Sequence, residues 1–511
     1  MHEPQGPYQI PTCREWVPEP LRAWLYLAFV LCIQFSGAVT MALTSQRAAA
    51  QGMLREDVLM AGFSMLVGMT MIFPNLFPLK FSRTGKSTLF LCALGLVACN
   101  VVSMYARSMA ILVPTCFFAG SIRMLATFEC FSTIQLKITP TRDFGKFLPV
   151  VYSVVLGMVQ FSGLVAVHLA DRFRWEAMNV LSIGLLLCVA LATRVFLKHI
   201  RLAPPFPFGK ADWLGHAMWS LFLLQGLFVL TYGEHFEWFD ADCIRSAVAG
   251  MLAMLLAILA RQRYVERPYI DLRAFGHRNV LTILVLFAAL SFLLSTPDVL
   301  QRAFTGGVLH YGALEESWLN APVLVGILCG ALFCFVAIPR FQIGYRIATI
   351  LGITLVLGYL VGMVRIMSPD TTREMMIVPL FLRGMGSAMV FTVLTIYAAR
   401  TIPFHHFFQM LAIMGFVHTD LGEPLGCAIV ERLLALRLRT GIQTLGSSID
   451  GLDPLPASQP LGAAVGQFQR DVLLVSIRNG YGIMILFGIL VVCLAAAARY
   501  RKVARFKMPR W

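Results

Sequence analysis

The sequence predicts an all-α polytopic membrane protein with fourteen transmembrane helices, arranged as two six-helix bundles and two inserted helices. Of its 511 residues, 58% are hydrophobic and 14% are charged, whereas soluble domains carry about 25% charged residues. The mean hydropathy is +0.74. Apolar runs of roughly 20 residues, the length that crosses a bilayer, recur along almost the whole chain. We therefore expect nearly all of the protein to lie in the membrane.

The apolar runs give the expected helices in order. The first run, Trp24 to Leu43, is too long for a signal-peptide core and lacks a cleavage pattern, so we expect it to remain as helix 1. Residues 1–19 form a cytoplasmic lead-in and 499–511 a basic tail. The expected spans are 21–43, 57–77, 87–106, 109–136, 147–170, 176–198, 213–233, 244–262, 278–304, 313–338, 346–366, 376–400, 405–432 and 479–498.

Charge distribution predicts the orientation. Lys and Arg gather in the loops that follow even-numbered helices, for example at Lys80, Arg340 and Arg400, while the loop that carries Glu234 and Asp240 on the other side is acidic. This bias predicts a multi-pass protein of the cell (inner) membrane with both termini in the cytoplasm. The net charge of +15 is dispersed through short loops, so we expect no nucleic-acid partner.

A weak internal repeat predicts the domains. Arg123 and Arg383 each lie part-way along a helix that enters from outside, one helix before a glycine-bearing helix. We expect bundles at 20–198 and 275–498, a linker with helices 7 and 8 at 199–274, and an outer loop at 433–478. Such repeats place the substrate site between the two bundles, near the middle of the membrane.

Helix 13 carries the most informative polar residues. His418, Asp420 and Glu423 lie near the middle of an apolar run, where ionisable groups are costly and usually mark an ion or substrate path. Asp420 and Glu423 are three residues apart, which predicts one shared helix face and a coupled proton site. The neighbouring residues that permit local unwinding are Gly422, Pro424 and Gly426. The alternative is that the pair only holds helix 13 to a neighbouring helix.

Three further charged residues are proton-coupling candidates. Arg123 and Glu129 lie on helix 4, six residues apart, so we expect each to find its partner on another helix. Asp298 follows Pro297 in helix 9, where the helix is expected to break and line the cavity. The alternatives are a structural hydrogen-bond hub for Arg123 and simple exposure at the outer mouth for Asp298.

Polar residues at mid-depth predict the substrate cavity, and interhelical hydrogen bonding is their alternative role. These candidates are Gln34, Ser36, Thr40, Gln160, Gln301 and Arg383. There is no Walker loop, metal-ligand cluster or nucleophile constellation in the sequence, so we expect neither ATP-driven transport, enzyme activity nor a cofactor.

Several short motifs follow one another in a familiar order. The insert reads ADWLGHAMWSLFLLQGLFVLTYGEHFEWFDADCIR, and the link to helix 9 reads VERPYIDLRAFGHRNVLTI. Further matches are Gln301, Gly306, Gly312 and Pro322 around helices 9 and 10, and Gly422, Gly426 and Ala428 on helix 13. Together they resemble the fourteen-helix drug:proton antiporter (EmrB-like) branch of the major facilitator superfamily, over nearly the whole chain.

The resemblance assigns further residues. It implies a conformational loop at Arg83, Gly85 and Lys86, and it matches Arg123 to the helix-4 arginine linked to proton coupling. The helix-5 antiporter signature is represented by Ser162, Gly163 and Ala166, without its Gly-Pro pair. In the loop, Pro78 and Ser82 replace a usual glycine and acidic residue, and on helix 1 Phe35 stands near the place of a frequent Asp.

These features predict a proton-driven exporter of hydrophobic or amphipathic small molecules that works by alternating access. The eroded helix-5 signature leaves a cation- or proton-coupled importer as the first alternative, and a membrane scaffold or sensor as the second. The resembled branch often works with a periplasmic adaptor and an outer-membrane channel, which would meet the outer loops, including residues 440–469.

Overall fold

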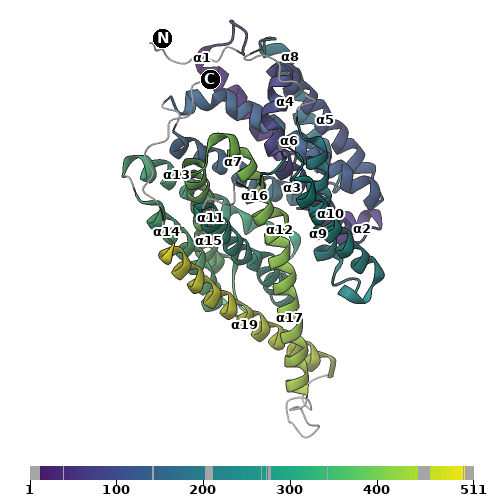
Figure 1. The fold of residues 1–511 in the computed structure, drawn as a ribbon. Helices are drawn as coiled ribbons and strands as arrows, with labels where there is room; N and C mark the ends of the chain where they lie inside the picture. Colours follow the sequence, from purple (N-terminus) through teal and green to yellow (C-terminus); the bar gives the residue numbers. More distant parts are fainter. Residues whose placement is uncertain are drawn as a thin grey trace.

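The computed structural model of the chain describes residues 12–37, 40–140, 143–201, 211–265, 268–271, 273, 278–341, 343–446, 461–498 and 500. This described part is all helical apart from one isolated β-bridge, between Cys13 and Leu197 (Figure 1). Helices occupy all fourteen expected ranges, and twelve of them are long and apolar enough to cross a membrane. The predicted fold class is confirmed, while the count of fourteen membrane crossings stays a prediction.

The helices follow the expected order, with breaks that the hydropathy pattern does not show. The first half holds α1 (Glu19–Phe35), α2 (Thr44–Gln51), α3 (Arg55–Met71), η1 (Phe73–Asn75), α4 (Leu76–Ser82), α5 (Gly85–Tyr105), α6 (Met109–Ile138), α7 (Phe144–Arg172) and α8 (Ala177–Phe196). The inserted helices are α9 (Trp213–Tyr232) and α10 (Asp242–Arg261). The second half holds α11 (Arg278–Thr296), η5 (Pro297–Gln301), η6 (Ala303–Val308), α12 (Ala313–Trp318), α13 (Asn320–Arg340), α14 (Tyr345–Ile366), α15 (Arg373–Thr401), α16 (Phe404–Gly415), η7 (Phe416–Asp420), α17 (Gly422–Gly446) and α19 (Leu461–Ala497).

Two predicted boundaries are wrong. Helix 1 was expected to reach Leu43, but α1 ends at Phe35 and turns follow before α2. The outer loop expected at 433–478 is largely helical, because α17 continues to Gly446 and α19 already begins at Leu461. The two helices project together beyond the rest of the bundle (Figure 1). Residues 447–460 of that expected loop, and nearly all of the expected tail, lie outside the described residues.

The second membrane helix is broken, and an inserted helix contacts the break. Pro74 has no N–H to donate within the helix, and α3 ends at Met71 before the 3-10 turn. The Met71 carbonyl instead lies 3.0 Å from Nδ1 of His216 on α9. The start of α9 is fixed in turn by Asp212, whose carboxylate accepts the backbone N–H of Gly215 at 2.9 Å. Helix α9 therefore packs against the point where the second helix loses its regular hydrogen bonding.

Glycines bring pairs of helices into close contact in the same way in both halves. A methyl group on Gly68 of α3 or Gly120 of α6 would collide with a backbone carbonyl of the facing helix. Gly326 of α13 and Gly384 of α15 make the same reciprocal contact. This recurrence supports the predicted internal repeat.

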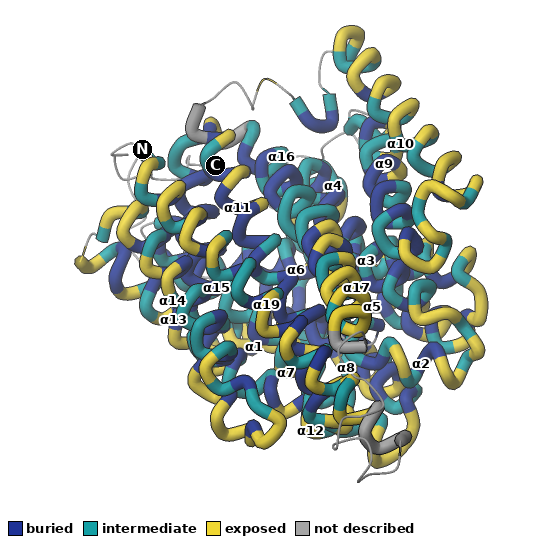
Figure 2. Tube along the Cα trace, turned by 90° about the horizontal axis from the view of Figure 1, so that it is seen from below, coloured by how far each residue is buried: buried dark blue, intermediate teal, exposed yellow. Residues whose placement is uncertain are grey.

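Burial distinguishes the core helices from the inserted pair. From Gly386 to Ala399, α15 is continuously buried, whereas α10 is largely exposed at the edge of the bundle (Figure 2). Helix α9 lies between α10 and α3. The inserted helices therefore cover one side of the bundle without entering its centre.

The two halves contact each other at several depths. At the end that we predict to be cytoplasmic, Arg400 of α15 lies 3.1 Å from Asp143 at the start of α7. Near them the Phe77 and Phe408 rings lie 4.7 Å apart. Deeper in the bundle, the hydroxyls of Tyr152 and Thr395 lie 2.7 Å apart. The two halves are thus held together at this end by an ion pair and packed aromatic rings.

Candidate functional site

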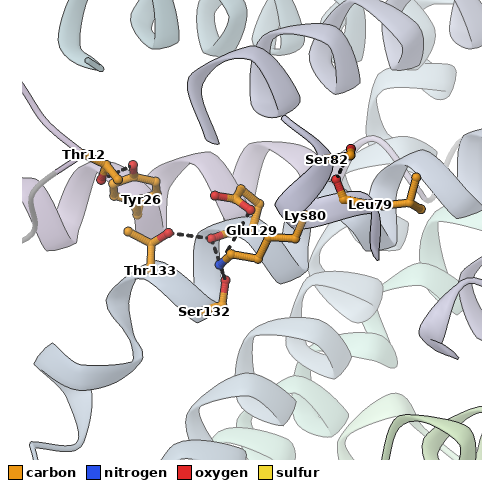
Figure 3. Close-up of polar contacts among 8 residues, drawn as sticks. All are labelled: Thr12, Tyr26, Leu79, Lys80, Ser82, Glu129, Ser132 and Thr133. Carbon is orange, nitrogen blue, oxygen red and sulfur yellow. Dashed lines mark hydrogen bonds and ion pairs between the residues drawn. The ribbon is translucent and has the colours of Figure 1, made fainter. Parts of the chain in front are cut away.

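Glu129 lies at a junction of three helices in the first half (Figure 3). Its carboxylate is buried and lies 3.7 Å from Nζ of Lys80 at the end of α4. Lys80 also donates to the Ser132 hydroxyl. A methyl group at Gly85, the first residue of α5, would lie 2.5 Å from Oε1 of Glu129. Glu129 therefore has its charged partner on another helix, as expected, and stands at the positive N-terminal end of α5.

The residues of the predicted conformational loop lie beside this junction. Thr84 caps α5, its hydroxyl accepting the backbone N–H of Ser87 at 3.3 Å. Lys86 donates at 3.0 Å to two carbonyls at the end of α8, those of Arg194 and Leu197. The loop therefore links the starts and ends of several helices of the first half, and Glu129 supplies a carboxylate close to the place where Ser82 replaces the usual acid.

Arg123 has no carboxylate partner within the described part of the chain. The residue is 4% exposed, and among the described residues the hydrogen-bonding contacts of its guanidinium are the sulfur atoms of Met65 at 3.1 Å and Met69 at 3.9 Å. Its Nε has no hydrogen-bond partner. A methyl group at Gly37, just beyond the end of α1, would overlap the guanidinium. Arg123 thus points at the break in helix 1.

Asp420 joins the two halves. It is fully buried at the end of the π-helical turn η7, where the chain leaves helical geometry at Leu421. Its Oδ1 accepts hydrogen bonds at 3.2 Å from Thr70 of α3 and from Thr419. Its Oδ2 has no partner in the described structure. The local unwinding expected in helix 13 is present, one turn earlier than its glycines.

Glu423 lies close to Asp298 of η5, whereas Asp420 has the separate partners described above. The prediction that Asp420 and Glu423 share one face assumed a regular helix, which the η7 turn interrupts. Asp298 also lies 3.9 Å from Arg302. Pro297 begins the irregular segment that carries Asp298, as expected. The structure therefore pairs Glu423 with a carboxyl group of a different helix.

His418 packs inside the second half. Its Nδ1 lies 2.6 Å from the Ser291 hydroxyl, and its ring centre is 4.4 Å from that of Phe391. The Ser291 hydroxyl donates to the Phe287 carbonyl at 2.7 Å, so the imidazole is the donor in its contact with Ser291. This arrangement is that of a hydrogen-bonded interior histidine.

The six cavity candidates do not converge on one place. Gln34 donates to Thr127 at 2.9 Å within the first half. Gln301 accepts from Tyr359 at 3.0 Å within the second half, where the Tyr359 hydroxyl also lies 3.2 Å from that of Tyr481. The remaining candidates have local contacts or intermediate burial: Ser36 donates to the Ile33 carbonyl at 2.7 Å, Thr40 lies 3.9 Å from Cys116, and Gln160 and Arg383 are partly buried.

The eroded helix-5 signature lies at the interface of the two halves. Helix α7 packs along α13, and a methyl group on Gly163 would lie 3.7 Å from the Asn320 amide. Ser162 donates to the Met158 carbonyl at 2.5 Å, and Ala166 is fully buried. Small residues thus allow close packing here without the missing proline.

Three polar residues with contacts between helices are not among the sites predicted from the sequence. Thr70 and Lys80 are common residue types in ordinary settings, and only the contacts across helices single them out. Arg47 was missed although it is a charged residue that falls just after an apolar run. It is fully buried and hydrogen-bonds to Ser103 and, at 3.1 Å, to Gln51.

Comparison with solved structures identifies the fold. The chain is similar to an auto-inhibited POT family peptide transporter, with 16% identity, a TM-score of 0.53, and coverage of 96% of this chain and 99% of that one. It is similar to the human organic anion transporter MFSD10 (10% identity, TM-score 0.52, coverage 94% and 100%) and to the nucleoside transporter NupG (10%, 0.52, 93% and 99%). No protein-family model and no protein of curated function matches the sequence. The all-helical architecture, the twelve apolar helices and these likenesses together give the chain the major facilitator fold.

Proposed function

We propose that the protein is a secondary active transporter that exports hydrophobic or amphipathic small molecules in exchange for protons, by alternating access. The three similar structures are named as transporters of peptides, organic anions and nucleosides. The sequence resemblance to drug:proton antiporters supports the direction and the coupling ion. The charge bias of the loops supports an inner-membrane protein with cytoplasmic termini.

One observation carries the proposal, which is the contact of Asp420 with Thr70 across the two halves at 3.2 Å. A buried carboxylate with one unpartnered oxygen is costly as an anion, so a proton on Asp420 stabilises the joined halves. When the halves separate at this depth, water reaches the carboxylate and the proton leaves. Proton binding and the alternating motion are therefore linked at a single residue.

The pair of Asp298 and Glu423 offers a second proton-binding place. Two carboxyl groups on neighbouring elements repel each other when both are ionised, and a proton on Glu423 would relieve that repulsion. Arg302 lies 3.9 Å from Asp298, so a positive charge also borders the pair. Exchange of protons at this pair would proceed within the second half.

The test is transport by purified protein in liposomes with an imposed pH gradient. A proton-coupled exporter concentrates a cationic or anionic amphipathic dye in the compartment that supplies the exchanged protons, and the Asp420→Asn protein does not. Insertion of the variant is expected to persist, since an amide is cheaper to bury than a carboxylate. The proposal fails if neither dye moves with the gradient and expression changes no drug tolerance.

Import is the second candidate, because α7 lacks the Gly-Pro pair of the antiporter signature and Pro149 lies in its first turns instead. Accumulation in right-side-out vesicles under an inward proton gradient distinguishes it from export. A non-transporting scaffold or sensor would show neither export nor import of the dye.

For an exporter that works with a periplasmic adaptor, we expect the adaptor to contact the projecting ends of α17 and α19. Crosslinks confined to the opposite end of the bundle would contradict this.

A further inference from the structure

The inference concerns Arg123 and deepens the proposed transport function by naming a substrate class. A guanidinium stays protonated in proteins, so Arg123 cannot itself carry the exchanged proton. It is a permanent positive charge, 4% exposed, in the middle of α6. A buried charge without an opposite charge costs several kcal/mol. Its place in the fold therefore calls for an anion.

The partners of Arg123 are weak and movable. Its contacts are two thioether sulfurs, from Met65 and Met69, and its Nε has no partner. Thioethers are weak hydrogen-bond acceptors, and methionine side chains have three rotatable bonds that let them swing aside. The two sulfurs therefore occupy the donor positions of the guanidinium as replaceable contacts.

Arg47 shows how the same chain satisfies an arginine with a structural role. Arg47 is also fully buried, and its guanidinium hydrogen-bonds to the Ser103 hydroxyl at 3.2 Å, the Ser103 carbonyl, and Gln51 at 3.1 Å, while lying over the Trp175 ring. Oxygen acceptors surround Arg47, whereas none in the described part of the chain contacts Arg123. The difference points to a function for Arg123 beyond packing.

The nearest candidate for a counter-charge is already engaged. Glu129 on the same helix lies against Lys80, which also donates to Ser132 (Figure 3). Helix 1 ends at Phe35. Gly37 follows, and because it has no side chain the Arg123 guanidinium fits against it, whereas a methyl group there would overlap the guanidinium. An incoming anion would thus meet a guanidinium beside Gly37, with no carboxylate of the described residues to displace.

The carboxyl groups of the second half have cations of their own. Arg302 lies 3.9 Å from Asp298, and Arg383 lies near Glu423. Arg123 in the first half, by contrast, has no counter-charge among the described residues. We infer that Arg123 binds the anionic group of the substrate, and that the substrates are amphipathic organic anions such as aromatic carboxylates.

The experiment measures binding in nanodiscs by equilibrium dialysis near pH 7, with three probes that share one apolar group. The probes are naphthylacetate, its uncharged methyl ester, and the naphthylmethyl trimethylammonium cation. We expect naphthylacetate to bind at least about tenfold more tightly than the other two, because a charge-assisted bidentate contact forms only with the carboxylate. Equal binding of the acid and the ester overturns the inference.

Substitution of Arg123 gives the second arm. Arg123→Gln should lower naphthylacetate affinity by roughly tenfold or more and leave ester binding unchanged, and Arg123→Lys, which keeps the charge without the fork, should give an intermediate value. Arg365→Gln, the same change at an exposed position of α14, should have no effect. Unchanged ester binding also shows that the variants are folded. Naphthylacetate affinity that is the same in all four proteins overturns the inference.

Failure of this inference and failure of the transport proposal give different results. If a pH gradient drives the cationic probe and Arg123→Gln transports it normally, proton-coupled transport stands and the anion site is wrong. If naphthylacetate binding depends on Arg123 but no gradient moves any probe, the anion site stands and the transport proposal is wrong.

Discussion

The Thr70 hydroxyl and the Asp420 carboxylate lie 3.2 Å apart, although 350 residues separate them in the chain and they belong to opposite halves of the fold. A methyl group on Gly415, one turn before Asp420, would lie 2.5 Å from the Thr70 methyl group. The two helices are therefore in contact at this depth, and any motion that parts the halves here breaks a hydrogen bond to a buried carboxyl group.

Removal of that donor should weaken coupling. We expect Thr70→Val to lower proton-driven transport about tenfold, because the hydrogen bond to a charged or polar buried group contributes on the order of 1 to 3 kcal/mol. Thr70→Ser keeps the hydroxyl and should transport normally. Transport rates in liposomes with an imposed pH gradient check this. Full activity of Thr70→Val would remove the Asp420 contact from the coupling path.

The carboxyl pair of the second half should behave as a unit. We expect Asp298→Asn and Glu423→Gln each to lower gradient-driven transport strongly without abolishing it, and the double variant to be no worse than either single one, because all three break up the same pair of carboxyl groups. The matched control combines Asp420→Asn with Glu423→Gln, which lie at separate sites, so their effects on the transport rate should add. Additive effects of Asp298→Asn and Glu423→Gln on the transport rate would contradict the pairing.

The ion pair of Asp143 and Arg400 should hold the halves together at the predicted cytoplasmic end. We expect Asp143→Asn, which keeps the side-chain cap of α7, and Arg400→Gln each to increase labelling of a cysteine introduced at Phe407 by a water-soluble maleimide. The effects should not add, with a coupling energy on the order of 1 kcal/mol for a partly exposed pair. Fully additive labelling rates would show that the two charges act independently.

The close glycine contacts predict that the same substitution, glycine to alanine, changes the stability of the protein differently at two positions. Gly68→Ala should destabilise the protein by roughly 1 to 3 kcal/mol, because its methyl group meets the backbone of α6. Gly184→Ala should be neutral or stabilising, because open space surrounds that glycine in α8 and alanine favours helices. Thermal unfolding of the detergent-solubilised proteins measures both. Equal melting temperatures would mean that α3 and α6 adjust freely.

The ion pair that fixes the start of α9 predicts a pH dependence of stability. Burial raises the pKa of Asp212, but hydrogen bonds from Arg261, at 2.6 and 2.8 Å, and from the backbone at Gly215 and Tyr269 outweigh it, so the pKa lies below its ordinary value. The stabilisation is therefore complete above the unfolded pKa of about 4 and is lost as the pH falls through the lower folded pKa. Asp212→Asn should melt below the wild type at neutral pH, with a difference that shrinks below about pH 4. A constant difference across that range would exclude this ion pair as its cause.

Hydropathy was sufficient to predict the helices because each must present an apolar surface to lipid, whatever its neighbours are. It was insufficient for helix ends, since α17 and α19 extend beyond the apolar runs and support each other through contacts such as Gly441 against Val472. The end of α1 at Phe35 also escaped notice, because the residues after it stay apolar while the backbone turns.

The candidate site was predictable in its residue types but not in its pairings. A carboxylate stands out in an apolar run, which is why Asp420, Glu423 and Asp298 are candidates from the sequence alone. Their partners depend on which helices face each other and on the π-helical turn before Leu421, neither of which follows from spacing in a regular helix. The separation of Arg123 from Glu129 was predictable, since six residues of an α-helix place two side chains on different faces.

The contact between His216 and the Met71 carbonyl gives the inserted helices a structural purpose. A chain with the same break at Pro74 that lacked α9 would leave the Met71 carbonyl without the donor it has here. A twelve-helix version of the protein would therefore need either an unbroken second helix or another donor at this position. Helix α9 thus supports α3 at its break, from the side of the bundle that the inserted helices cover.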